Sequence, residues 1–139
     1  MHKDFVTSPN PKLNYFPPAE GVDRGSALII FPGGGYWGRA KHEGEGYAEF
    51  FAANGFHCFV CDYRVAGEEG EALDPAPLED GLFAISSVRK RAKELGFSAN
   101  RVGIIGSSAG GHLAAHLSAV SRRWGDEYRP QWTILCYPV

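Results

Sequence analysis

The chain has 139 residues, which is enough to bury a core as a single domain. Its hydrophobic content of 44% and charged content of 22% are ordinary for a soluble globular protein. A formal net charge of −2 gives no basis for binding nucleic acid or an anionic membrane, and no apolar run reaches membrane-spanning length. The amino terminus lacks the apolar segment of a signal peptide, so we expect a cytoplasmic protein.

Short apolar runs, typical of buried strands, alternate along the chain with segments of helical periodicity. A proline-rich start, in which residues 12–16 could form a short edge strand, precedes them. We expect, in order, a strand at 27–31, a helix at 45–54, a strand at 56–61, a helix at 78–95, a strand from 102, a helix to about 120 and a strand at 132–137. This order predicts an α/β fold, with a parallel sheet and helices on both faces.

Two charged segments fit solvent-exposed structure. The acidic, glycine-rich stretch from Gly67 to Pro77 is predicted to be a solvated loop. The basic cluster 89–91 lies near the end of a predicted helix, where positive charge complements the helix dipole, and it does not indicate a nucleic-acid site.

The three cysteines, an odd number, argue against a disulfide framework. Cys58 and Cys61 have C-x-x-C spacing, but they lie in a predicted strand, where residues three apart face opposite sides. We therefore expect buried thiols and no shared metal.

Two glycine-rich segments follow predicted strands, at the end where parallel sheets bind their ligands. Residues 33–35 are three consecutive glycines, which let a backbone approach a ligand closely with free N–H groups. Residues 106–110 read Gly-Ser-Ser-Ala-Gly between a strand and a helix, the setting of a nucleophile elbow. This context predicts that Ser108 occupies a strained turn with its hydroxyl projecting above the sheet.

Three other interpretations of this segment fail. Gly106 and Gly111 have P-loop spacing, but His112 and Leu113 stand where Lys and Ser or Thr would contact phosphate and magnesium. The glycines do not fit the dinucleotide-binding spacing either. His112 and His116 are four apart on one helix face, but Leu113 replaces the Glu of a zinc motif, so packing or a polar lining role is favoured.

The two glycine-rich segments together indicate acyl transfer. Attack of a hydroxyl on an ester carbonyl creates an oxyanion, which fixed N–H donors must stabilise. In this geometry one donor is the residue after the nucleophile, here Ala109, and the others come from the loop after an earlier strand. Gly34 and Gly35 are our candidates for that loop. His42, which follows the glycine loop, is more simply a polar loop residue than a substitute base.

Three segments resemble the α/β-hydrolase-fold serine esterases: Phe31–Tyr36, His42–Ala48 and Gly106–Leu113. Their pattern is most similar to acetylesterases and xylan-esterase-like proteins related to the hormone-sensitive-lipase type. Pro32 departs from the lipase-type pattern, which has His before the glycines. The resemblance implies that Ser108 is the nucleophile, that Gly34, Gly35 and Ala109 form the oxyanion hole, and that the substrates are acetyl or other short acyl esters, acetylated sugars included. We expect no cofactor and no metal, and neither nucleic acid nor membrane as a partner.

The triad acid and base are not recognisable in the sequence. In this fold they follow the nucleophile in the order Asp or Glu, then His. Asp126 and Glu127 precede the last predicted strand, and the only histidines after Ser108 are 112 and 116. We therefore expect residues 1–139 to be the N-terminal part of one α/β-hydrolase domain, inactive alone, with an uncovered sheet edge that could support self-association. The alternative is a complete, non-catalytic α/β binding or interaction module.

Overall fold

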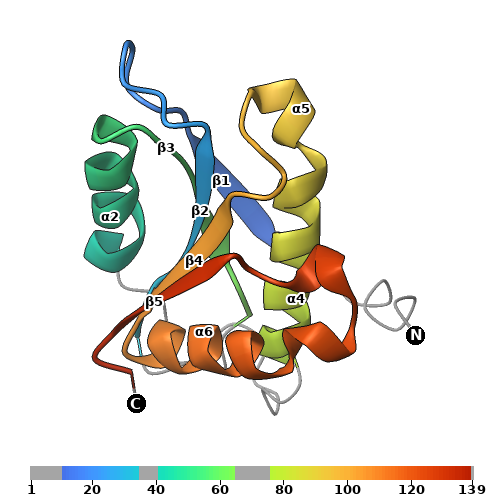
Figure 1. Ribbon diagram of the computed structural model, residues 1–139. Helices are drawn as coiled ribbons and strands as arrows, with labels where there is room; N and C mark the ends of the chain where they lie inside the picture. Colours follow the sequence, from blue (N-terminus) through green and yellow to red (C-terminus); the bar gives the residue numbers. More distant parts are fainter. Residues whose placement is uncertain (1–10, 35–40, 65–75, 139) are drawn as a thin grey trace.

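The computed structural model describes residues 11–34, 41–64 and 76–138 (Figure 1). The elements in chain order are β1 (Lys12–Phe16), β2 (Ser26–Phe31), α2 (Lys41–Ala53), β3 (Phe56–Asp62), α4 (Ala76–Lys90), α5 (Ala92–Leu95), β4 (Val102–Ser107), α6 (Ala109–Val120), the 3₁₀ turns η1 (Ser121–Arg123) and η2 (Asp126–Tyr128), and β5 (Trp132–Cys136). Among the described residues, none of the helices combines the length and the hydropathy of a membrane-spanning segment.

The five strands form one sheet in the order β1-β3-β2-β4-β5. Strands β2 to β5 are parallel, with Ile29 opposite Phe59 on one side and Ile104 on the other. The edge strand β1 is antiparallel to β3. Because the four parallel strands end at the same edge, the residues that follow β2 and β4 come together there.

Helices cover both faces of the sheet, as the alternation of elements predicts. Helix α2 lies on one face, and α4 and α6 lie on the other (Figure 1). Alternate residues of β2 divide between the two layers: Ile29 packs with α4 and α6, whereas Leu28 and Ile30 pack with α2. Cys61 and Cys58 divide in the same way, which confirms that the C-x-x-C pair faces opposite sides of the sheet.

The long helix predicted at 78–95 is divided in the structure. Helix α4 ends at Lys90, and the Arg91 N–H bonds the Val88 carbonyl in a tighter turn before α5 begins. Gly96 ends α5 in the left-handed conformation, φ 91°, as expected of a C-cap glycine.

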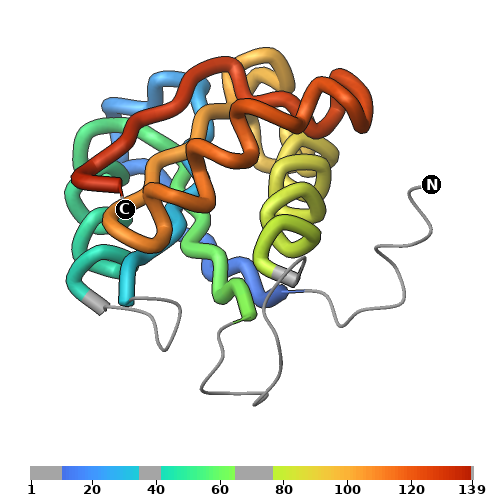
Figure 2. The backbone as a smooth tube through the Cα atoms, turned by 90° about the horizontal axis from the view of Figure 1, so that it is seen from below, coloured from blue at the N-terminus to red at the C-terminus, as the bar shows by residue number. Residues whose placement is uncertain are grey.

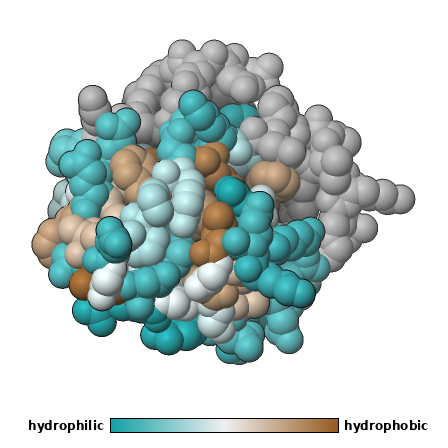
Figure 3. Space-filling view, turned by 90° about the horizontal axis from the view of Figure 1, so that it is seen from above, coloured by the Kyte–Doolittle hydropathy of each residue, from teal (hydrophilic) through white to brown (hydrophobic). Residues whose placement is uncertain are grey.

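Strand β5 forms an edge that no other described strand pairs. Ile134 and Leu135 on this strand are 37% and 44% exposed. The face of the molecule at the amino ends of the parallel strands carries mostly hydrophilic side chains, with smaller apolar areas between them (Figure 3).

Candidate active site

The turn between β4 and α6 holds Ser108 in a conformation that non-glycine residues rarely adopt, with φ 50° and ψ −115°. Its N–H donates to the Cys136 carbonyl at 2.9 Å, and its carbonyl accepts from the His112 N–H at 2.9 Å, in the first turn of α6. The side chain is half-buried. Ser108 therefore stands at a strained corner at the amino end of α6, as the strand, turn and helix pattern predicts.

Glycines on either side of Ser108 allow backbone segments to meet without a side chain between them. A Cβ on Gly106 would lie 2.1 Å from the Gly110 carbonyl oxygen. A Cβ on Gly110 would lie 1.9 Å from the Phe31 carbonyl oxygen, at the end of β2. Side chains at either position are excluded by backbone atoms, so the turn requires both glycines.

The glycine loop after β2 lies directly beside the serine. A Cβ on Gly33 would be 3.2 Å from the Ser108 Cβ and 2.7 Å from the Ser107 carbonyl oxygen. Gly34 follows in an exposed position with φ 136°, and Ala109 is fully buried at the start of α6. Seen from below, the ends of β2 and β4, the start of α6 and the end of β5 meet around this point (Figure 2).

Of the predicted site residues, Ser108, Ala109 and Gly34 thus lie together at the carboxyl ends of β2 and β4. Gly35 lies outside the described residues, as does most of the acidic stretch from residue 67.

A buried carboxylate next to the glycine loop was not predicted from the sequence. Glu43, in the first turn of α2, is 6% exposed, and its Oε1 accepts a 2.9 Å hydrogen bond from the Gly33 N–H. Its Oε2 accepts from the Tyr137 hydroxyl, just beyond β5. The hydrogen bond to Glu43 raises the pKa of Tyr137 most, and a hydrogen bond with Tyr47 raises it further, so the Tyr137 hydroxyl remains a donor.

Two more tyrosines contact this region. The Tyr63 hydroxyl, fully buried after β3, donates to the Pro32 carbonyl oxygen. The Ser107 hydroxyl donates to the Tyr47 hydroxyl at 3.0 Å. The only sequence signal for these contacts was the position of Glu43 and Tyr47 within the esterase-like segment 42–48.

The structure leaves the described histidines away from Ser108 or exposed. The side chain of His42 is 80% exposed, with Nε2 3.7 Å from Glu43 Oε2. His112 and His116 are exposed on α6, their ring centroids 6.4 Å apart. His57 is buried at the start of β3, between the Tyr15 hydroxyl and the Asp23 carboxylate. Within the described ranges, no group of three or more His, Cys, Asp or Glu side chains could hold a metal ion.

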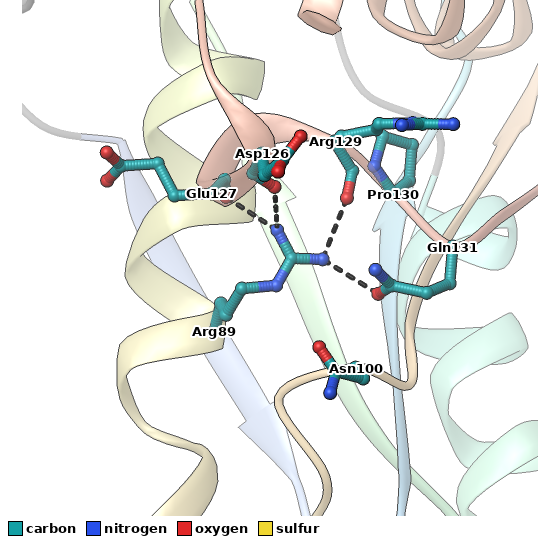
Figure 4. Close-up of a pocket in the computed structure, with 7 residues that line it drawn as sticks. All are labelled: Arg89, Asn100, Asp126, Glu127, Arg129, Pro130 and Gln131. Carbon is teal, nitrogen blue, oxygen red and sulfur yellow. Dashed lines mark hydrogen bonds between the residues drawn. The ribbon is translucent and has the colours of Figure 1, made fainter.

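The two carboxylates after Ser108 belong to a different part of the molecule. Asp126 and Glu127 lie in η2, beside a pocket of about 440 Å³ near the start of β4 and β5 (Figure 4). The Arg89 guanidinium fills the middle of this pocket and donates to carbonyl oxygens of Ala99 and the η2 segment and to the Gln131 side chain. Because its donors are taken by the chain itself, this pocket is a structural junction at the far end of the sheet from Ser108. Burial there lowers the pKa of Arg89.

Comparison with known proteins identifies the family of this chain. The BD-FAE family profile matches residues 13–127. The chain is 38% identical to the acetylxylan esterase of Xylanibacter ruminicola over 116 residues, which are 83% of this chain and 23% of that protein. It is 36% identical to the endo-1,4-beta-xylanase B of Butyrivibrio fibrisolvens over 81% of this chain and 19% of the other. The chain thus spans about a fifth of the length of each of these two relatives.

Solved structures show the same fold. The acetyl ester-xyloside bifunctional hydrolase of Caldicellulosiruptor lactoaceticus is 36% identical and superimposes with a TM-score of 0.76 over 96% of this chain and 51% of that one. An α/β-hydrolase enzyme from a deep-sea metagenome library superimposes at 0.75, with 32% identity, over 91% of this chain and 51% of the other. The chain thus spans about half of each of these two solved structures. It belongs to the BD-FAE family and has the α/β-hydrolase fold, and proteins similar to it include an acetylxylan esterase.

Proposed function

We propose that this chain is the nucleophile-bearing part of a serine carboxylic-ester hydrolase. The Ser108 Oγ attacks the ester carbonyl carbon and loses its proton to a base. The tetrahedral oxyanion then collapses and the base gives that proton to the departing alcohol oxygen, which leaves an acyl group on Ser108 that water removes. The single observation that carries the proposal is the strained Ser108 backbone at the amino end of α6, directly beside Gly33.

The oxyanion in this proposal receives the N–H groups of Ala109, Gly34 and Gly35. Ala109 is the first residue of α6, so its N–H is not used by the helix ladder. Gly34 adjoins the glycine that contacts Ser108. Fixed donors at a developing negative charge contribute about 10²–10³ each in rate.

Short acyl esters, acetylated sugars among them, are the proposed substrates. The support is the similarity to proteins described as an acetylxylan esterase and an acetyl ester-xyloside hydrolase. The reaction needs no cofactor or metal, because proton transfer and N–H donors are sufficient for acyl transfer.

The acid and base of the triad are proposed to lie outside these 139 residues. Asp126 and Glu127 lie at the opposite end of the sheet, and His112 and His116 are on the serine's own helix. A serine without its base is weakly nucleophilic, so we expect residues 1–139 alone to show little turnover. Among the described residues no strand pairs with the outer side of β5, and Ile134 and Leu135 on this strand are exposed. This supports the proposal over the alternative of a self-contained binding module, because such an edge can pair with further strands or with a second copy.

Hydrolysis of 4-nitrophenyl acetate tests the proposal with two polypeptides. The first is the 139-residue chain, and the second joins it to the carboxy-terminal half of a homologous esterase that carries the acid and base. We expect turnover only in the joined polypeptide, reduced about 10⁴–10⁶-fold by Ser108→Ala. Rapid hydrolysis by the 139-residue chain, lost in Ser108→Ala, would show that the base lies within it. Hydrolysis by the joined polypeptide that survives Ser108→Ala would reject the nucleophile.

A further inference from the structure

The peptide bond between Pro32 and Gly33 is held at both ends by buried side chains. Its carbonyl oxygen accepts from the Tyr63 hydroxyl, and its N–H donates to Glu43 Oε1 at 2.9 Å. Tyr63 is fully buried and Glu43 is 6% exposed. We call these two hydrogen bonds the peptide clamp.

The clamp is reinforced by its surroundings. The second oxygen of Glu43 accepts from the Tyr137 hydroxyl, so both carboxylate oxygens have donors. A Cβ on Gly110 would lie 2.7 Å from the Pro32 carbonyl oxygen, which places the first turn of α6 against the same peptide. The peptide plane is therefore fixed by contacts from α2, from the end of β3 and from α6.

The orientation of this peptide decides where the next amides point. Gly33 and Gly34 have no side chains to restrict their backbone, so rotation of the Pro32–Gly33 peptide would redirect the N–H groups that follow. An oxyanion hole works only when its donors are fixed before the reaction. A rotated Pro32–Gly33 peptide would move the Gly34 N–H away from the position where the oxyanion forms.

We propose that Glu43 and Tyr63 are positioning residues, which hold the Pro32–Gly33 peptide so that the Gly34 N–H can donate to the oxyanion. This inference rests on the proposed esterase function. Glu43 acts through Gly33 and does not touch the substrate. The required feature of Glu43 is an oxygen that accepts the Gly33 N–H. Its negative charge is not required, because a negative charge near the site opposes the oxyanion. Glu43→Gln is therefore expected to preserve most of the function, and Glu43→Ala to remove it.

The clamp can be measured in the 139-residue chain without any catalysis. Pro32–Gly33 is the only Pro–Gly pair in the sequence. Labelling proline with ¹³C at the carbonyl carbon and glycine with ¹⁵N therefore gives a single NMR correlation, which belongs to the Gly33 amide. We expect this amide to exchange slowly with solvent, about tenfold or more faster in Glu43→Ala, and nearly as slowly as wild type in Glu43→Gln.

Two matched variants separate the clamp from general loss of stability. Glu49→Ala removes an exposed carboxylate from the same helix, and Tyr15→Phe removes a tyrosine hydroxyl bonded to His57 on β3. Once the exchange rate of the Gly33 amide is corrected for each variant's change in the free energy of global unfolding, both variants should match wild type. Tyr63→Phe should exchange faster than wild type after the same correction. A Gly33 amide that exchanges like an unstructured one, or that responds equally to Glu43→Ala and Glu49→Ala, would overturn the proposal.

The positioning role is tested in the joined polypeptide that hydrolyses 4-nitrophenyl acetate. Glu43→Ala should lower kcat about 10²-fold with little change in KM, and Glu43→Gln should restore most of it. Full kcat in Glu43→Ala would reject the role. Ser108→Ala should abolish hydrolysis and leave the Gly33 amide protected. If the joined polypeptide shows no Ser108-dependent hydrolysis, the proposed function fails, and the positioning role fails with it, while a protected Gly33 amide would still establish the clamp.

Discussion

Substituting Gly110 with alanine tests the contact on which the geometry of Ser108 depends. The added Cβ would lie 1.9 Å from the Phe31 carbonyl oxygen, 2.6 Å from its carbon and 2.7 Å from the Pro32 carbonyl oxygen. All three are backbone atoms, so no change of rotamer can relieve the overlap. Either the end of β2 or the first turn of α6 must move.

The expected magnitude follows from two opposing effects. Overpacking of this kind costs about 1–3 kcal/mol and occasionally more, while alanine is favoured over glycine within a helix by up to about 1 kcal/mol. Because the overlap is with rigid backbone, we expect Gly110→Ala to lower the free energy of unfolding by about 2 kcal/mol. For a chain of this length that corresponds to a fall in Tm of roughly 6–10 °C.

Gly46→Ala is the matched control, with the opposite expected sign. Gly46 lies within α2, and the nearest atom to its added Cβ is the His42 Cβ at 3.9 Å, an ordinary contact. Alanine should therefore stabilise the chain by about 0.5–1 kcal/mol. Urea unfolding followed by the fluorescence of the three tryptophans measures both variants. If Gly110→Ala unfolds at the wild-type midpoint, α6 does not approach β2 as closely as the structure shows.

Three further outcomes are expected. Arg89→Lys loses most of the hydrogen bonds that the guanidinium donates to the η2 segment and Gln131, and should lower the free energy of unfolding by about 1–3 kcal/mol; an unchanged urea midpoint would show that these bonds are dispensable. Burial raises the pKa of the Cys58 thiol to about 12 from 9.0, so the stability it contributes is present below about pH 9 and lost as pH rises towards 12. Unfolding between pH 8 and 10.5 should show a steeper decline in wild type than in Cys58→Ala, and equal slopes would contradict the shift. Leu135→Lys should reduce self-association measured by sedimentation velocity, and wild type that stays monomeric at high concentration would remove the basis for this expectation.

The sequence is sufficient to predict the layers of this fold because burial on both faces leaves a direct signature. Strands such as β2 are continuously apolar, and helical periodicity separates them, so the parallel α/β arrangement follows from pattern alone. The direction of β1 does not follow, since a five-residue edge strand pairs equally well in either direction by composition. The break at Arg91 is also hidden, because apolar spacing continues across it from Val88 to Ala92 and Leu95.

In the candidate site, too, the features formed by neighbouring residues could be predicted from the sequence, and those formed by residues far apart in the chain could not. Ser108 and its flanking glycines form a contiguous segment, so their spacing predicts a strained turn. Glu43 and Tyr137 are 94 positions apart, and their contact exists only once α2 and β5 have been placed by the sheet. Glu43 lies in the esterase-like segment 42–48, but nothing in that segment indicates Tyr137 as its partner, and Tyr137 has no neighbouring pattern that distinguishes it from an ordinary exposed tyrosine.

The close backbone contacts around Ser108 link the end of β2 to the turn between β4 and α6. A side chain on Gly33 would strike the Ser107 carbonyl, one on Gly106 would strike Gly110, and one on Gly110 would strike Phe31, two residues before Gly33. The backbone contacts of this corner therefore come mainly from residues 31–33 and 106–110, whereas proton transfer requires groups that we place outside the chain. It follows that changes within these two segments should alter both stability and ester hydrolysis, while changes to the acid or base should alter hydrolysis alone.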